Sequence, residues 1–255
     1  MSTYKGIKGF TIQNLSADPP APILGQVWYN STSNVLKARG AGDGVWASGG
    51  ALDTARANMF GFGGSISDAS VVGGSTPSAS ALNEQYDGST WSEEADINTA
   101  RSTESRTGAG TQTAGLIYGS GAVGNTTESW NGTSWAAATG YTTPRRASGG
   151  MGIQTAALNV GGRNPPVGDY ALTEEYNGST WSEEADINTA RYLSIGMGTA
   201  TSALLSDGYA TGPGYVLINE LYNGTAWTEV GNTNSHHSGG GGSEAGSNTA
   251  SLVYG

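Results

Sequence analysis

Five basic residues recur along the chain at a nearly constant spacing, and together they could form a binding site for an anion. Each lies ten residues after one of five tryptophans: Arg56, Arg101, Arg145, Arg191 and His237. Repeats of about 45 residues are typical of blades set around an axis, so equivalent bases would meet at one mouth of a channel. The alternative is a structural role, because a buried arginine is usually paired. The acids available for such pairing are Glu84, Glu128, Glu174 and Glu220.

A second repeated set consists of aromatic pairs. Four of the tryptophans follow another aromatic residue by five positions, in the pairs Tyr86/Trp91, Trp130/Trp135, Tyr176/Trp181 and Tyr222/Trp227. Aromatic rings supply stacking faces, so these pairs could be equivalent glycan-binding sites between blades. They could instead form the core by wedging between neighbouring sheets. Both interpretations stand at this point.

Other chemistry finds little support. The chain has no cysteine, which excludes thiolate metal sites, cysteine nucleophiles and copper sites built on a Cys–Tyr crosslink. His236 and His237 would point to opposite faces of a strand, which makes them a poor metal pair. A glycan hydrolase needs paired carboxylates, and the irregular loops 74–80 and 207–215 carry none. We expect no catalytic residues, no metal and no cofactor.

The charge balance narrows the class of partner. The formal net charge is −10, and the 11 lysines and arginines form no basic stripe of the kind that neutralises phosphates. We therefore expect no nucleic-acid partner. No apolar run reaches the roughly 20 residues that span a bilayer, and the start of the chain does not read as a signal peptide. These features predict a protein made in the cytoplasm without membrane insertion.

Four short strands can be read in each repeat unit. A glycine-rich strand A, such as 107–111, is followed by an apolar strand B, such as 114–119. Strand C ends in an acid and an aromatic residue, and strand D opens with the anchor tryptophan. Between strands C and D lies Asp-Gly or Asn-Gly, which predicts a tight hairpin with positive φ at both residues. Glycine in strand A would allow close approach of backbones near the axis.

The two chain ends predict how the ring closes. Residues 237–246 and 249–255 read as strands A and B of a last unit, whose strands C and D are supplied by 34–39 and 44–47. The expected fold is therefore all-β, a five-bladed propeller with four-stranded blades of about 45 residues. Its anchors are Trp46, Trp91, Trp135, Trp181 and Trp227. Residues 1–26 form an N-terminal attachment arm, and residues 27–255 form the propeller.

The unit resembles a kelch repeat. Gly73-Gly74 and Gly161-Gly162 match the glycine pair after strand B, and Glu84-x-Tyr86-Asp87, Trp91 and Arg101 match the rest. It is more similar to kelch-like proteins of marine tailed bacteriophages. The segments that carry this resemblance are residues 98–101, 108–114 and 176–181 of the repeats and residues 4–10 and 25–32 of the leader. That resemblance implies a virion structural or tail-fibre-like protein.

The functional hypothesis follows from this resemblance. The chain would be a non-enzymatic virion protein whose propeller decorates the head or forms a tail or fibre knob, for host-surface adhesion or particle stabilisation. Its partners would be other virion proteins through the arm, a host cell-surface glycan, and further copies of itself on the particle. The alternative is a lectin-like propeller with repeated glycan sites, and a glycan hydrolase is a remote third. Fold alone does not decide among these functions.

Overall fold

The computed structural model describes residues 13–19, 27–38, 49–102, 107–120, 124–237, 241–242 and 253–254. The chain divides into two compact units, Met1–Ser48 and Gly49–Gly255. All regular secondary structure in the described residues is β-strand. This agrees with a sequence in which short apolar runs alternate with glycine-rich turns.

Four antiparallel sheets of four strands, which we call blades 1 to 4, make up most of the second unit. Blade 1 contains β4 (Phe60–Ser65), β5 (Asp68–Val72), β6 (Asn83–Tyr86) and β7 (Trp91–Glu94). Blade 2 contains β8 (Gly108–Thr111), β9 (Ala114–Ser120), β10 (Gly124–Trp130) and β11 (Trp135–Ala138). Blade 3 contains β12 (Gly149–Ile153), β13 (Ala156–Val160), β16 (Thr173–Tyr176) and β17 (Trp181–Glu184). Blade 4 contains β18 (Ile195–Thr199), β19 (Ser202–Ser206), β22 (Asn219–Tyr222) and β23 (Trp227–Val230).

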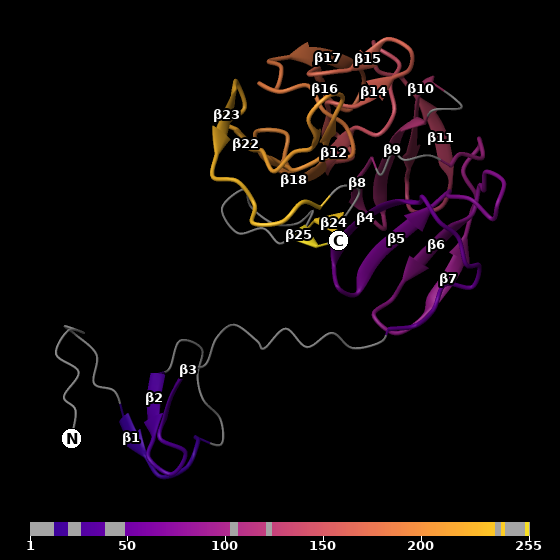
Figure 1. Cartoon of the computed structure of the whole chain (residues 1–255). Helices are drawn as coiled ribbons and strands as arrows, with labels where there is room; N and C mark the ends of the chain where they lie inside the picture. Colours follow the sequence, from indigo (N-terminus) through magenta and orange to yellow (C-terminus); the bar gives the residue numbers. More distant parts are fainter. Residues whose placement is uncertain are drawn as a thin grey trace. The chain divides into compact units, whose positions relative to one another are not determined.

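These four blades are arranged in a ring, as in a β-propeller (Figure 1). Their first strands lie side by side in chain order, β4 beside β8, β8 beside β12, and β12 beside β18. The predicted order of strands A to D and the position of the tryptophan at the start of strand D are confirmed in all four blades.

Blades 3 and 4 each carry an additional hairpin between strands B and C. The first consists of β14 (Arg163–Asn164) and β15 (Gly168–Asp169), and the second of β20 (Tyr209–Ala210) and β21 (Gly214–Tyr215). The backbone N–H of Thr211 donates a 2.6 Å hydrogen bond to Asp169 Oδ2, which links the two hairpins. Neither hairpin is needed to complete a four-stranded blade.

Glycine in strand A permits the close contact between blades that the sequence predicts. A Cβ built on Gly108 would lie 2.4 Å from the carbonyl oxygen of Gly61 in the preceding blade, and one on Gly196 would lie 2.7 Å from that of Gly150. Real Cβ atoms do not approach backbone oxygens so closely. The first strands therefore pack backbone to backbone.

Replacing Gly108 by alanine should destabilise the protein by about 1–3 kcal/mol, because the new methyl group would push blade 2 away from blade 1. Gly61→Ala is the matched control, since its Cβ would meet nothing nearer than an oxygen at 3.8 Å. Urea unfolding followed by tryptophan fluorescence measures both. Equal stability of the two variants would show that the blades can separate at no cost.

The loop between strands C and D differs from the predicted hairpin. Tyr86 pairs directly with Trp91, so the loop has four residues, and only its glycine has a positive φ, 93° at Gly88. Asp87 Oδ1 accepts hydrogen bonds from the backbone N–H groups of Ser89 and Thr90, at 2.8 and 2.7 Å. These bonds, that from Thr90 first, lower the pKa of Asp87. The expectation of positive φ at both residues was wrong, because the side-chain oxygen closes the turn instead.

A two-stranded sheet follows blade 4, where the sequence predicts strands A and B of the closing blade. It pairs β24 (Gly241–Gly242) with β25 (Val253–Tyr254) in antiparallel fashion, and β24 lies beside β18 (Figure 1). The predicted strand D at 44–47, with its anchor Trp46, lies outside the described residues.

The first unit contains a sheet of its own. Its strands are β1 (Gln13–Leu15), β2 (Val27–Asn30) and β3 (Val35–Ala38), in the order β1-β2-β3. Trp28 is buried, and its Nε1–H donates a 2.9 Å hydrogen bond to Asp18 Oδ1. The strand predicted at 34–39 is thus present as β3. One of its edges pairs with β2, which the sequence analysis did not predict. The predicted boundary at residue 26 falls between two strands of this sheet.

Candidate functional site

The four repeated arginines form ion pairs inside the blades. Each lies just before the first strand of a blade, and its guanidinium reaches the glutamate on the third strand of the same blade. The pairs are Arg56–Glu84, Arg101–Glu128, Arg145–Glu174 and Arg191–Glu220. All four arginine side chains are fully buried. A buried guanidinium that contacts a carboxylate is already neutralised, so it would bind a second anion only weakly.

The Arg191–Glu220 pair shows how these groups connect chain segments. The two side chains are 2.5 Å apart, and Arg191 also donates to the carbonyl oxygen of Thr189. Glu220 Oε2 accepts hydrogen bonds from the backbone N–H and side-chain Nδ2 of Asn188, at 2.8 and 2.6 Å. Burial lowers the pKa of Arg191, and the hydrogen bond to Glu220 opposes that shift. The pair therefore fixes the segment entering blade 4 to the third strand of that blade.

The fifth base, His237, has a different partner. Its Nδ1 lies 3.0 Å from Asp207 Oδ2, and its backbone N–H donates to the same oxygen at 3.1 Å. Asp207 is fully buried and has φ +53°, at the position where blades 1 and 3 have the first glycine of a Gly-Gly pair. The side chain of Asp207 thus connects blade 4 to the segment that enters the C-terminal sheet.

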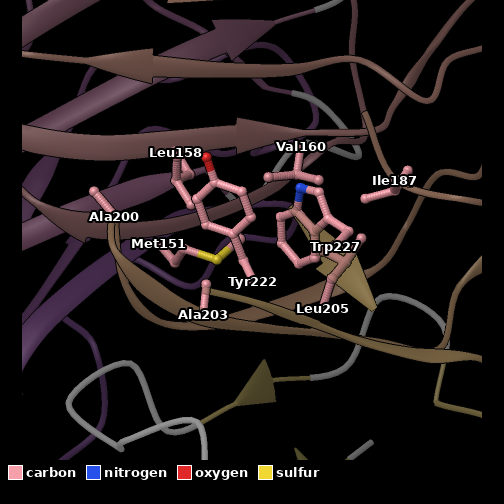
Figure 2. Packing of buried hydrophobic residues seen from close by; sticks show 9 residues of the cluster. All are labelled: Met151, Leu158, Val160, Ile187, Ala200, Ala203, Leu205, Tyr222 and Trp227. Atoms are coloured by element: carbon pink, nitrogen blue, oxygen red, sulfur yellow. The ribbon is translucent and has the colours of Figure 1, made fainter. Parts of the chain in front are cut away.

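The aromatic pairs of blades 2, 3 and 4 belong to the core. Their exposed fractions are between 0% for Trp130 and Tyr222 and 8% for Trp181. Each pair packs against the preceding blade: Trp181 contacts Tyr118 of blade 2, with ring centroids 5.0 Å apart. Figure 2 shows the same arrangement between blades 3 and 4, where Tyr222 and Trp227 lie among aliphatic side chains. The residues drawn with them are Met151, Leu158, Val160, Ile187, Ala200, Ala203 and Leu205.

The pair on blade 1 is different. Tyr86 and Trp91 contact each other with centroids 5.1 Å apart, as in the other blades, but both are only half-buried in the described structure. The indole N–H of Trp91 donates to Gly50 O at 3.0 Å, just as that of Trp181 donates to Thr139 O. The same contact is therefore made, although this pair is less buried than its counterparts in blades 2 to 4.

A buried tyrosine on the connection between blades 2 and 3 has a strongly raised pKa. Tyr141 is fully buried, and its hydroxyl lies 2.7 Å from Arg145 O and 2.8 Å from Gly124 O, within hydrogen-bonding distance of both acceptors. Burial raises the pKa of Tyr141 from 10.0 to about 12, against the smaller opposing effect of Arg145. The phenol is therefore held in its neutral form.

Stability should fall in alkaline solution because of Tyr141. The unfolded chain releases this proton near pH 10 and the folded chain near pH 12, so the stabilisation is complete below pH 10 and is lost as the pH rises towards 12. Between pH 9 and pH 11 the loss from this residue should be about 1 kcal/mol. Urea unfolding of the protein and of Tyr141→Phe at both pH values isolates the loss of stability that comes from Tyr141. An identical pH dependence of the two would contradict the shift.

The sequence analysis did not identify two positions in each repeat that lie next to repeated residues but vary in residue type. One position comes directly after the repeated arginine, and the other directly after the glycine pair or, in blade 4, after Asp207-Gly208. Their backbones pair in isolated bridges. The bridges are Ala57–Ser75 in blade 1, Arg146–Arg163 in blade 3 and Tyr192–Tyr209 in blade 4. The signal that could have found them is variation in residue type at a fixed place in an otherwise regular repeat.

Comparison with known proteins adds no identification: no protein-family model matches the chain, and no curated protein matches its sequence. The described residues include no group of three or more acids and histidines placed to hold a metal ion. Nor do they contain a helix long and apolar enough to cross a lipid bilayer.

Proposed function

We propose that this chain is a non-enzymatic structural protein of a tailed-bacteriophage virion, in which a rigid propeller is displayed on the particle. The observation that carries the proposal is that the repeated residues are buried and serve the structure of the blades. In the four complete blades, the arginine–glutamate pairs are buried and hold each blade together. Such a construction suits a stiff platform whose surface loops can vary. The phage assignment rests on the sequence resemblance alone.

The proposal includes a fifth blade that closes the ring. In it, β24 and β25 would be joined by β3 and by residues 44–47, and β3 would have to exchange its pairing with β2 for pairing within this blade. Support comes from Tyr86 and Trp91, which are half-buried although their counterparts in blades 2 to 4 are buried against a preceding blade. Closure would bury this pair as well, and it would leave no unpaired strand edge in the ring.

The N-terminal arm, residues 1–26, would attach the protein to the particle. The site would be the head, as decoration, or the tail, as part of a fibre or knob, with other virion proteins and further copies of this chain as partners. The display of the propeller would serve adhesion to a host-surface glycan or stabilisation of the particle. Multiple copies would raise avidity even where each contact is weak.

A glycan-binding propeller with repeated sites is the second candidate. Half-buried Tyr86 and Trp91 favour it, because one aromatic pair presents some surface to solvent. The buried pairs in blades 2 to 4 count against five equivalent sites. A binding role would therefore have to use residues outside the repeated set.

The location of the protein tests the main proposal. Antibodies against the purified chain would be used for immunogold microscopy of gradient-purified particles of a phage that encodes it, with mass spectrometry of the same fraction. Gold at regular positions on the head or tail is the expected result. Absence of the protein from purified particles, while it is present in the infected-cell lysate, would overturn the virion role.

A further inference from the structure

Two arginines face each other beside a cavity between blades 2 and 3. Arg146 and Arg163 exchange backbone hydrogen bonds of 2.9 and 2.8 Å, so they are directly opposite residues of an antiparallel bridge. Side chains of such a pair project to the same side and lie close together, and like charges in this position are destabilising. The arrangement therefore costs stability unless an anion offsets the two positive charges, and Asp169, 4.0 Å from Arg163, offsets one of them in part.

The cavity beside these arginines has the size and lining for a small anionic group. Its volume is about 190 Å³, and Arg145, Arg146, Arg163 and Asn164 contribute to its wall. Arg145 is neutralised by Glu174. Arg146 forms no ion pair within the part of the chain that is described, and its buried Nε has no hydrogen-bond partner there. Arg163 has only a long contact with Asp169, at 4.0 Å.

A row of aromatic rings extends from Arg163 to the surface of blade 4. The guanidinium carbon of Arg163 lies 4.3 Å above the ring of Tyr192, which fixes the side chain by a cation–π contact. Tyr192 contacts Tyr209, and Tyr209 contacts Tyr215, with centroid separations of 5.4 and 5.2 Å. Tyr215 stacks on His236 at 4.2 Å, with the ring planes 10° apart. Tyr215 is 54% exposed, so the row ends in an open aromatic surface.

These residues are not required by the fold. At the equivalent bridge in blade 1, alanine and serine serve the same backbone pairing. The arginines and tyrosines are confined to blades 3 and 4, where the two extra hairpins lie and where the bond from Thr211 to Asp169 holds them together. The exposed ring of Tyr215 and the guanidinium of Arg146, which has no ion pair among the described residues, are both costly without a ligand, which points to recognition.

We propose that this face binds an acidic saccharide, with a carboxylate or sulfate between Arg146 and Arg163 and a sugar ring packed on the outer face of the Tyr215–His236 stack. Guanidinium groups bind planar oxyanions through paired hydrogen bonds. Aromatic faces pack against the C–H groups of a sugar ring, and they give contact area at low entropic cost. A long polyanion such as nucleic acid is disfavoured, because the chain has a net charge of −10.

A chondroitin sulfate tetrasaccharide is a suitable probe, because it carries both carboxylate and sulfate groups. Titration calorimetry with the full chain should give a Kd below about 1 mM. Arg146→Gln and Arg163→Gln should each weaken binding about tenfold or more, since each removes a charged hydrogen-bond donor. Tyr215→Ala should weaken it several-fold, about 2–10 times, whereas Tyr215→Phe should retain it.

The controls separate this site from general charge attraction and from misfolding. Val167→Ala changes an exposed residue on the β14–β15 hairpin and should leave affinity unchanged. The same tetrasaccharide, desulfated and methyl-esterified, should not bind. Equal binding of the neutral sugar, equal binding of a ten-residue oligothymidylate, no binding of the acidic sugar, or unchanged affinity in the arginine variants would each overturn the proposal. All variants must keep the near-UV dichroism of the parent.

Saccharide binding at this face does not depend on the virion role. The binding test uses the purified chain, and the particle test uses location. Failure of one therefore leaves the other intact.

Discussion

Glu220→Gln should lower the free energy of unfolding by about 3–5 kcal/mol, because it leaves the guanidinium of Arg191 buried without a counter-charge. Both side chains are completely buried. Glutamine keeps the shape of the side chain but replaces one carboxylate oxygen by an amide nitrogen, which cannot accept a hydrogen bond. Asn188 and Arg191 both donate to this carboxylate, so one of them would lose its acceptor. Guanidinium chloride unfolding followed by fluorescence measures the change.

The matched control for this substitution is Glu229→Gln. Glu229 lies directly opposite Glu220 in the β22–β23 ladder but is exposed, so its replacement should change stability by no more than about 0.5 kcal/mol. The double variant Arg191→Met with Glu220→Leu should recover most of the loss, because it removes both buried charges. If Glu220→Gln costs no more than Glu229→Gln, the pair does not hold the blade together.

Trp181→Ala should cost about 3–5 kcal/mol, the usual range for removal of a buried tryptophan. Its ring contacts Tyr118, Tyr141 and Tyr176 at centroid distances of 5.0, 5.9 and 5.2 Å, and so joins blade 2 to blade 3. The substitution would leave a cavity that these three large rings cannot fill without moving a whole sheet. The midpoint and slope of chemical denaturation give the loss.

Ile153→Ala serves as the control for Trp181→Ala. Ile153 ends β12 in the same blade and is 53% exposed, so its loss should change stability by less than about 1 kcal/mol. A small effect of Trp181→Ala would indicate that the repeated tryptophans are not the contacts that join the blades. The hypothesis that they form accessible sites would then regain support.

The sequence was sufficient to predict the strand order within the four blades that the structure shows, but not the use of their residues. The tryptophan spacing aligned the repeats, and the glycine-rich, apolar and acid–aromatic segments then placed strands such as β9 and β16 within a few residues. The sequence did not decide whether Arg191 faces a channel or contacts Glu220. Periodicity gives the position of a residue along a strand but not its partner across the sheet. The same limit left the role of Trp181 undecided.

Departures from the repeat were the hardest features to predict. The pairing of β1 with β2 joins segments that share no pattern with the blades. The hairpin 163–169 lies between two correctly predicted strands, and nothing in its composition showed that it would form a separate pair. Residues such as Arg146 and Tyr215 gain their significance only when the bridges bring them to one face. These positions depend on tertiary contacts between repeats, which local pattern does not encode.

The most direct test of this account is hydrogen exchange of the full chain compared with a version that lacks residues 1–48. A propeller closed by the N-terminal strand predicts that the deletion speeds exchange of the Val253 and Tyr254 amides by about tenfold or more, and also exposes the loop at Trp91. Amides of β13, far from the closing blade in the chain order, should exchange as before. Unchanged protection at Val253 and Tyr254 after the deletion would contradict closure by the N-terminal segment.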